Sequence, residues 1–180
     1  MQNIQKYKKE VFNLLEKISS NQKDKFFKVA QEFYKTYKKN GMIYIFGTGH
    51  SHMLAEEGHF RAGGFAAICP ILNSSLMLHE DTIFSSVLER TEGVATNLIK
   101  KYNIESKDIL VIFTNSGVNQ APLEASYIAK KLKCKTVGVS SESYSKIAKK
   151  SKYKKRLSEV VDYHFDNYGP PGDALIEIKK

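Results

Sequence analysis

Residues 42–60, MIYIFGTGHSHMLAEEGHF, constrain the fold of this chain more than any other stretch. They begin with five consecutive apolar residues, 42–46, which are too few for a helix. A run of this kind is typical of a strand that is buried on both faces, as in a parallel sheet. Gly47 and Gly49 then allow a sharp turn, and helix-forming residues follow Ser51. The junction predicts an anion site at a helix amino terminus, suited to a small phosphorylated molecule.

Two common phosphate motifs do not fit this junction. A Walker loop needs a glycine before a lysine, and no glycine of this chain precedes a lysine. A dinucleotide fingerprint needs a third glycine where His52 stands, and an acid at the end of the second strand, which instead ends in Leu72 and Asn73. The sequence therefore disfavours NAD and ATP, and we expect no cofactor.

Strand and helix patterns alternate through the remainder of the chain. Further strands are expected at 66–72, 109–113, 136–139 and 160–165. Helices are expected near 51–61, from Asp81 or Thr82 through 99, and at 122–132, with a short basic helical stretch before the last strand. This alternation predicts an α/β domain over residues 41–180, with a doubly wound, five-stranded parallel sheet.

Residues 1–40 are expected to form a helical hairpin, because apolar side chains recur at helical spacing on both sides of a break at 19–21. The hairpin would pack on the core or on a partner subunit. The aromatic residues Phe26, Phe33 and Tyr37 are more than a lone hairpin buries, which favours a subunit interface. At the other end, the apolar run 174–178 is followed by two lysines only. An open sheet of this kind normally covers its last strand with a helix, so a carboxyl-terminal helix is expected to be missing.

The charge and cysteine content narrow the class of protein. The net charge of +9 comes from 28 Lys and Arg against 19 Asp and Glu. Most lysines are scattered, and the dense cluster 149–156 has one aromatic residue, so an exposed loop or helix face is favoured over a nucleic-acid surface. Cys69 and Cys134 have no metal-binding spacing and suit reduced thiols. No signal peptide or membrane span is visible, and a cytoplasmic protein is expected.

A second junction, FTNSGVNQAP at 113–122, repeats the geometry of the first with hydroxyl groups in place of glycines. Thr114 and Ser116 come from the carboxyl end of a strand, Gly117 turns the chain, and Asn119 can cap the next helix. Hydroxyls and free helix N–H groups bind phosphate without a lysine. An ordinary capped turn explains this loop equally well when it is taken alone. In a 2-1-3-4-5 sheet, however, both loops face one crevice, which favours a binding site.

The two junctions together resemble the SIS (sugar isomerase) phosphosugar-binding family. GTGHS at 47–51 is similar to the family's Gly-x-Gly-x-Ser, and NSGVN at 115–119 to its Ser-Gly-x-Thr loop. The stretches FRAGG, LMLHE, LER-x-EG and PGDA look most similar to an uncharacterised bacterial branch described as phosphoheptose isomerases. The resemblance covers about residues 42–178. It implies a flavodoxin-like sheet, a homodimer or larger assembly, and a phosphosugar ligand held by Gly47, Gly49, His50, Ser51, Thr114, Asn115, Ser116, Gly117 and Asn119.

The chain departs from the family in two ways. Asn119 stands where many members have threonine, which changes one ligand contact. Members of this branch also continue through another helix, and in many SIS isomerases the equivalent segment supplies part of the active site. Its absence bears on catalysis more than on fold or binding.

An aldose–ketose isomerase needs a base that moves a proton between C1 and C2, and an acid at the carbonyl. Glu57 and His79 are the candidates, because both are expected just beyond the carboxyl ends of the strands. His79 lies in LMLHED, which is similar to an Ala-Leu-His segment of related isomerases. Glu57 is equally consistent with a surface acid that offsets lysines, and His79 with a capping residue.

A metal site is the alternative use of the same helix. His52, Glu56 and His59 stand at i, i+4 and i+7, on one face. Phosphoheptose isomerases use helix His and Glu ligands for zinc, but at different offsets from the loop serine. The spacing is also not that of a His-Glu-x-x-His hydrolase. We therefore expect no metal.

Three classes of function remain. The first is a sugar-phosphate isomerase of the phosphoheptose type. The second is a phosphosugar-binding sensor or regulator without catalysis, so that enzyme activity stays open. The third, a nucleic-acid regulator, is disfavoured because no DNA-binding module is visible. The identity of the sugar is not encoded in these motifs.

Overall fold

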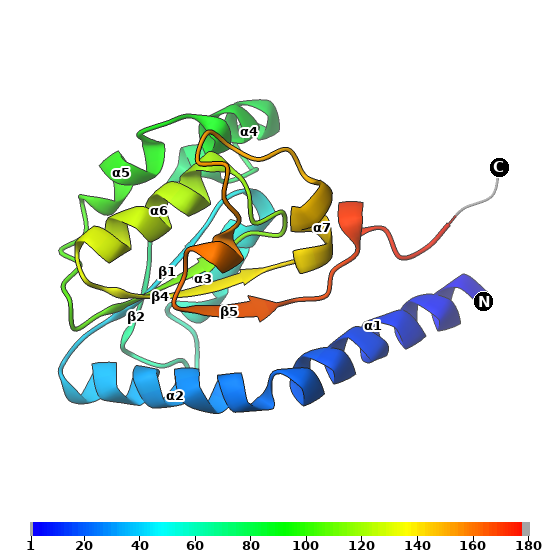
Figure 1. Ribbon diagram of the computed structural model, residues 1–180, viewed down its shortest axis with the longest axis horizontal. Helices are drawn as coiled ribbons and strands as arrows, with labels where there is room; N and C mark the ends of the chain where they lie inside the picture. The colour runs from blue at the N-terminus through cyan, green and yellow to red at the C-terminus, as the bar shows by residue number, and fades with distance from the viewer. Residues whose placement is uncertain (1, 178–180) are drawn as a thin grey trace.

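One parallel sheet forms the centre of the molecule. The computed structural model describes residues 2–177, and within them five strands pair in the order β2-β1-β3-β4-β5 (Figure 1). The predicted flavodoxin-like order is therefore confirmed, and the direction of strand succession reverses between β1 and β3. The strands are β1 Ile43–Gly47, β2 Ile68–Pro70, β3 Ile109–Phe113, β4 Lys135–Ser140 and β5 Tyr163–Asp166.

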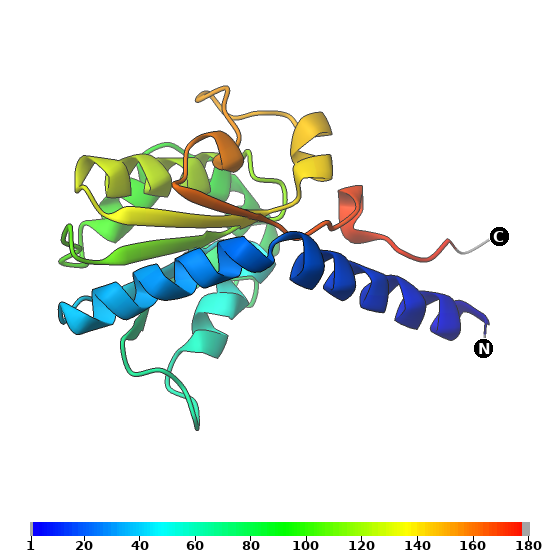
Figure 2. The ribbon, with the colours of Figure 1, turned by 60° about the horizontal axis from the view of Figure 1, so that its bottom comes forward.

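The sheet is buried on both faces, which explains why β1 and β3 are continuously apolar. Phe46 and Ile112 belong to the core that includes side chains of α5 (Val94–Ile99) and α6 (Gln120–Lys131). Their neighbours Ile45 and Val111 belong to a second core with α2 (Lys23–Lys38) and α3 (Met53–Gly58). Figures 1 and 2 show α2 on the side of the sheet opposite α6. The doubly wound arrangement follows from this alternation of side chains.

The long helix expected up to residue 99 is two helices, α4 (Thr82–Arg90) and α5. Asp81 caps α4 as predicted, because its Oδ1 accepts from the N–H groups of Ile83 and Phe84 at 2.9 Å. Gly93 separates the two helices. Its φ is 86°, a left-handed conformation that residues with a side chain rarely adopt. Its N–H donates to the buried carboxylate of Glu124 at 2.9 Å. The apolar periodicity continues across the break, which is why it reads as one helix.

Several element boundaries also differ from the sequence prediction. The helix expected near 51–61 is a 3-10 turn, η1 (Gly49–His52), followed by α3. Strand β2 is shorter than 66–72, and β5 begins after Val160, which is buried in the turn behind η3 (Leu157–Glu159). The basic helical stretch is α7 (Glu142–Ile147), and the lysine cluster after it forms a largely exposed loop. A further 3-10 turn, η2 (Ser74–Leu76), precedes α4.

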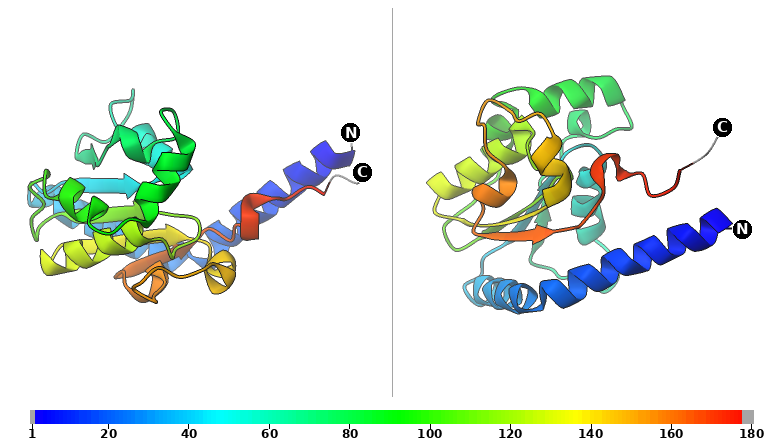
Figure 3. Two further views of the ribbon diagram at one scale, coloured as in Figure 1. Left: turned by 90° about the horizontal axis from the view of Figure 1, so that it is seen from above. Right: turned by 45° about the vertical axis from the view of Figure 1, so that its right-hand side comes forward.

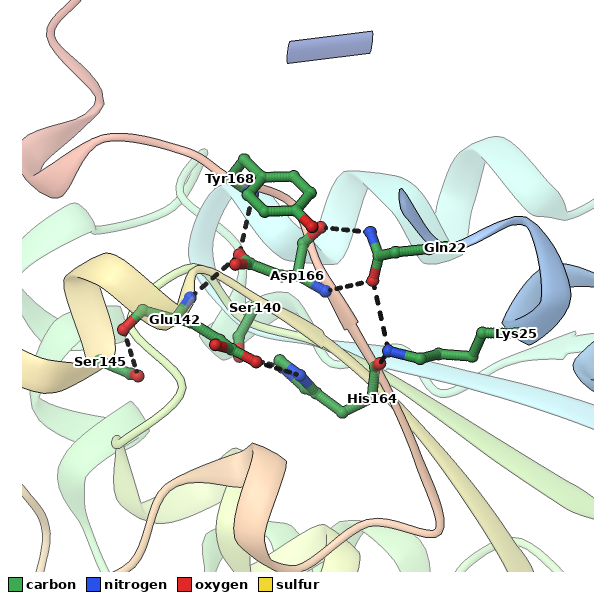
Figure 4. A network of polar contacts seen from close by, with 8 residues as sticks. All are labelled: Gln22, Lys25, Ser140, Glu142, Ser145, His164, Asp166 and Tyr168. Carbon is green, nitrogen blue, oxygen red and sulfur yellow. Dashed lines mark hydrogen bonds and ion pairs between the residues drawn. The ribbon is translucent and has the colours of Figure 1, made fainter. Parts of the chain in front are cut away.

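The two amino-terminal helices form, but the predicted hairpin does not. Only Gln22 separates α1 (Gln2–Asn21) from α2, and one residue is too short to reverse the chain. Figures 1 and 2 show α1 continuing α2 with a bend and projecting beyond the sheet. The bend is held to the edge strand, since the Gln22 side chain donates to Asp166 O (2.8 Å) and accepts from Asp166 N (2.9 Å) (Figure 4).

Helix α1 therefore differs from α2 in its environment. In the described helix Gln2–Asn21 no residue is buried, and Ile4, Tyr7, Phe12 and Leu15 are all more than half exposed. By contrast, α2 buries Val29 against the sheet. Nowhere in residues 2–177 is there a helix with the length and apolarity to cross a membrane.

The segment after β5 ends in a 3-10 turn, η4 (Pro171–Asp173), beside α7. The apolar run expected at 174–178 lies partly outside the described residues. Residues 174–177 have no regular secondary structure, and residue 178 and the two lysines after it are not described.

Candidate functional site

A crevice of about 360 Å³ lies at the carboxyl ends of β1 and β3, where the strand order reverses. It brings together residues from both predicted junctions. The first junction contributes Gly49, His50 and Ser51, and the second contributes Thr114, Asn115, Ser116 and Asn119. The convergence that the 2-1-3-4-5 order predicted is therefore seen in the structure.

Gly47 and Gly117, the other two glycines predicted for the site, do not line the crevice, but they shape its two loops. A Cβ on Gly47 would lie 2.4 Å from the carbonyl oxygen of Ser51, so only glycine lets η1 fold back onto the end of β1. Gly117 has a φ of 65°, and a Cβ there would also lie 2.8 Å from Ser140 Oγ. Both positions require glycine for backbone reasons.

Two hydroxyl groups of the crevice are buried without a hydrogen-bond partner. They are Thr48 Oγ1, directly after β1, and Ser116 Oγ, after β3, and neither has a partner among the described residues. A buried polar atom normally has one, and leaving it unpaired costs about 1–3 kcal/mol. Two such atoms in one crevice are available to hydrogen-bond a polar molecule from outside the chain.

The amino end of α6 faces the same loop. Asn119 occupies the N-cap position, but its side chain makes no capping hydrogen bond to the described helix. Instead its amide donates to Glu89 Oε1 on α4 at 2.7 Å. The predicted cap is therefore wrong, and the positive end of the helix dipole lacks a side-chain acceptor of its own. An anionic ligand fits such a position.

Sequence reasoning missed several residues of the crevice wall. Glu89 lies in the LER-x-EG stretch, whose resemblance to known proteins was a usable signal. Asp173 accepts a hydrogen bond from Asn115, whose own oxygen accepts from Asn167 Nδ2 at 3.1 Å. Asp173 lies in PGDA, but no pattern there indicated a contact with Asn115. The other missed wall residues are Thr48, Leu78, Thr82, Ser85, Ser86 and Tyr144.

The two predicted catalytic residues do not belong to the described lining of the crevice. Glu57 forms an ion pair with Arg61 on the surface, and its side chain is 68% exposed. His79 is exposed, with Nε2 2.8 Å from the sulfur of Met77. Glu57 follows the first loop on α3, whereas His79 lies between η2 and α4, and the fold places neither of them in the crevice wall. Their catalytic roles stay predictions.

Of the three residues considered as metal ligands, only His52 and Glu56 are in contact. His52 Nδ1 lies 3.0 Å from Glu56 Oε1, and the His52 ring is buried. Burial lowers the pKa of His52, and the nearby Glu56 carboxylate opposes that shift. His59 is exposed beside Phe60. In the part of the chain that the structure describes, no three His, Cys, Asp or Glu side chains are grouped to hold a metal. The absence of a metal stays a prediction.

Comparison with known proteins identifies relatives at the level of sequence. The SIS domain model matches residues 6–141. The UPF0309 proteins of Brucella ovis and Brucella abortus are 43% identical over 136 residues, which is 76% of this chain. That match covers 55% of each relative, so the chain spans about half the length of the curated relatives it matches.

Comparison of structures agrees on the fold. Phosphoheptose isomerase GmhA from Neisseria gonorrhoeae superposes with a TM-score of 0.70 at 14% identity, covering 95% of this chain and 88% of that one. A phosphoheptose isomerase from Francisella tularensis gives a TM-score of 0.68 at 15% identity, covering 97% and 86%. At these identities the likeness establishes a shared α/β fold.

Proposed function

Because the chain belongs to the SIS domain family, we propose that the crevice between β1 and β3 binds a phosphorylated sugar. The observation that carries this proposal is the pair of buried, unpartnered hydroxyls, Thr48 Oγ1 and Ser116 Oγ, beside the amino end of α6. Hydroxyl and backbone donors that converge at a helix amino terminus suit a phosphate dianion. His50, Ser51, Thr114 and Asn115 then supply further hydrogen bonds to phosphate or sugar.

The reaction that we propose is the interconversion of an aldose and a ketose phosphate, as the names of the two structural neighbours suggest. A carboxylate must reach C1 and C2 of the sugar while the phosphate is held by the serine loop. Glu89 is better placed for this than Glu57, since it lines the crevice and receives a hydrogen bond from Asn119. The orientation that this bond gives to the carboxylate supports Glu89 as the base.

A sensor or regulator that binds the phosphosugar without converting it is the second candidate. The specific observation in its favour is the position of Glu57 and His79, since both are exposed outside the described crevice lining. The two candidates share one binding site and differ only in proton transfer at C2. Binding and proton transfer are therefore tested separately below.

The assembly and location of the protein are also part of the proposal. We infer that α1 packs against a second copy of the chain, because its apolar side chains are exposed along the helix. We further infer a reducing, cytoplasmic environment, since Cys69 and Cys134 are both free thiols. Burial raises the pKa of Cys134 to about 12, which leaves it an inert core thiol.

Replacing Ser116 tests phosphate recognition. We expect Ser116→Ala to weaken binding of fructose 6-phosphate by about tenfold or more, because one hydrogen bond to a charged group is lost. Isothermal titration calorimetry measures the effect. Ser19→Ala, on the exposed face of α1, is the matched control and is expected to bind as the wild type does. Equal affinity of the wild type for fructose and fructose 6-phosphate would contradict phosphate recognition.

Proton transfer is tested by exchange at C2. We expect NMR to show that the wild-type protein catalyses deuterium incorporation at C2 of glucose 6-phosphate or another aldose phosphate from a panel. Glu89→Gln is expected to reduce the rate by at least about 100-fold, in the range of general-base catalysis, while Glu57→Gln reduces it little. Loss of exchange in Glu57→Gln alone would restore Glu57 as the base. Tight binding without exchange across the panel would favour the sensor.

Removal of α1 tests the assembly. Deleting residues 2–20 leaves Gln22 and α2 in place, so the domain is expected to stay folded. Light scattering should then show a smaller assembly than the full chain forms, with an unchanged circular dichroism spectrum apart from the lost helix. A full chain that is monomeric, or an assembly that survives the deletion, would contradict a role for α1 in the interface.

A further inference from the structure

A second cavity, of about 460 Å³, lies beside the crevice on the other side of the Ser-Gly turn. It is enclosed by the amino end of α6, the end of α4 and the basic loop 148–152. The loop passes over this end of α6, as Figures 1 and 3 show in orange. The two cavities share Ser116, Asn119 and Tyr144 in their walls, so a ligand held by the serine loop borders both.

The wall of the second cavity contains hydrogen-bond donors that nothing in the described chain satisfies. Gln120 is 3% exposed, and its Nε2 has no partner among residues 2–177. The buried Ser151 Oγ on the opposite wall is also unpartnered. An amide NH₂ group can only donate, so Gln120 requires an acceptor from outside the chain. The first turn of α6, a helix of 12 residues, adds the positive end of its dipole.

The charge around this cavity is also positive. Arg90, Lys149, Lys150 and Lys152 line it against a single carboxylate, Glu92, which pairs with Lys152. Lys149, Lys150 and Lys152 belong to the basic cluster 149–156, and they line this cavity but not the crevice.

Backbone hydrogen bonds fix the position of the loop that carries these lysines. Ser151 N donates to Val118 O at 3.1 Å, and Leu157 N donates to Gly117 O at 2.7 Å. These two bonds tie the basic loop to the turn that carries Ser116. The positive wall of the second cavity therefore has a defined position relative to the phosphosugar crevice.

We propose that the second cavity binds a second anionic group of the same ligand, so that the preferred ligand class is a sugar phosphate carrying another phosphate. This inference rests on the proposed function, because it assumes that the first phosphate occupies the crevice. Buried donors, a helix amino terminus and an excess of lysine then meet the second phosphate across the shared wall of Ser116, Asn119 and Tyr144.

Calorimetry on the full chain with fructose 6-phosphate and fructose 1,6-bisphosphate tests the proposal. The wild type is expected to bind the bisphosphate at least about tenfold more tightly, since one extra bond to a charged group contributes that much. In Lys149→Gln/Lys150→Gln the ratio of the two affinities is expected to fall toward about 1. The matched control is Lys130→Gln/Lys131→Gln, at the other end of α6, which removes the same charge and should keep the wild-type ratio.

The outcomes separate this inference from the proposed function. Equal wild-type affinity for the two compounds would overturn the inference and leave the phosphosugar site intact. A preference for bisphosphate that persists in Lys149→Gln/Lys150→Gln, or that falls equally in the control, would overturn it as well, since the preference would then arise elsewhere or from net charge. Binding of neither compound would overturn the proposed function, and the inference with it.

Discussion

The buried carboxylate of Asp108 fixes the register on which the crevice depends. Asp108 is 3% exposed and lies directly before β3. Its Oδ1 accepts from the N–H of Met42, directly before β1, at 2.8 Å, and its Oδ2 accepts from Glu105 N at 2.7 Å. Hydrogen bonds from backbone N–H groups to a buried carboxylate are among the stronger ones in proteins. They hold the starts of the two central strands level.

Because β1 and β3 start level and have the same length, they also end level. Ile43 pairs with Ile109 and Gly47 with Phe113, so Thr48 and Thr114 leave the sheet side by side. Each strand then opens into a tight turn before a helix. The convergence of hydroxyls and helix N–H groups in the crevice is thus a consequence of sheet register together with two glycines, Gly47 and Gly117. No long-range contact between the two loops is required for it.

The sequence was informative wherever burial dictated residue type. β3 was predicted at its observed bounds because it is buried on both faces, and strand–helix alternation predicted the parallel sheet. The flavodoxin-like strand order was what the family resemblance implied. Helix continuity was predicted poorly, since a single glycine at 93 breaks a helix without disturbing its apolar period. The predicted amino-terminal hairpin was wrong because the break at 19–21 was taken for a reversal of the chain. The structure has a bend at Gln22 instead, held by hydrogen bonds to Asp166, a contact that is distant in sequence.

In the candidate site too, residues next to a strand end were predicted, and residues brought in by tertiary packing were not. The predicted residues Gly49, His50, Ser51, Thr114, Asn115, Ser116 and Asn119 all line the crevice, because they belong to the loops that follow β1 and β3. Their role in binding stays a prediction. Glu89 and Asp173 were missed, since they enter the crevice from α4 and η4 through tertiary packing. The two catalytic candidates were chosen because they were expected just beyond the carboxyl ends of the strands. A side chain at that end of the sheet can still face solvent, as Glu57 does.

A polar ligand would satisfy several groups that the fold leaves unpaired. The unpartnered atoms around the Ser-Gly turn are Thr48 Oγ1, Ser116 Oγ, Gln120 Nε2 and Ser151 Oγ. At the carboxyl end of β4 the chain supplies its own partner, because Ser140 Oγ lies 2.8 Å from Nε2 of His164 on β5 (Figure 4 labels both residues). Burial lowers the pKa of His164, and the nearby Glu142 carboxylate opposes that shift. The four atoms around the Ser-Gly turn line the two cavities in which the ligand is proposed, and the other unpartnered buried atoms of residues 2–177 are the ring nitrogens of His52, one of which lies 3.0 Å from Glu56 Oε1.

Amide hydrogen exchange with bound sugar phosphate tests the central claim most directly, because it reports on the backbone N–H groups of both loops, which side-chain truncations leave in place. With saturating fructose 6-phosphate, we expect exchange to slow in residues 48–51 and 115–121 together, while the far end of α6 is unchanged. The two loops must respond as one unit, since they are proposed to hold one phosphate. Slowed exchange confined to a single loop, or confined to the face under α2, would contradict the account.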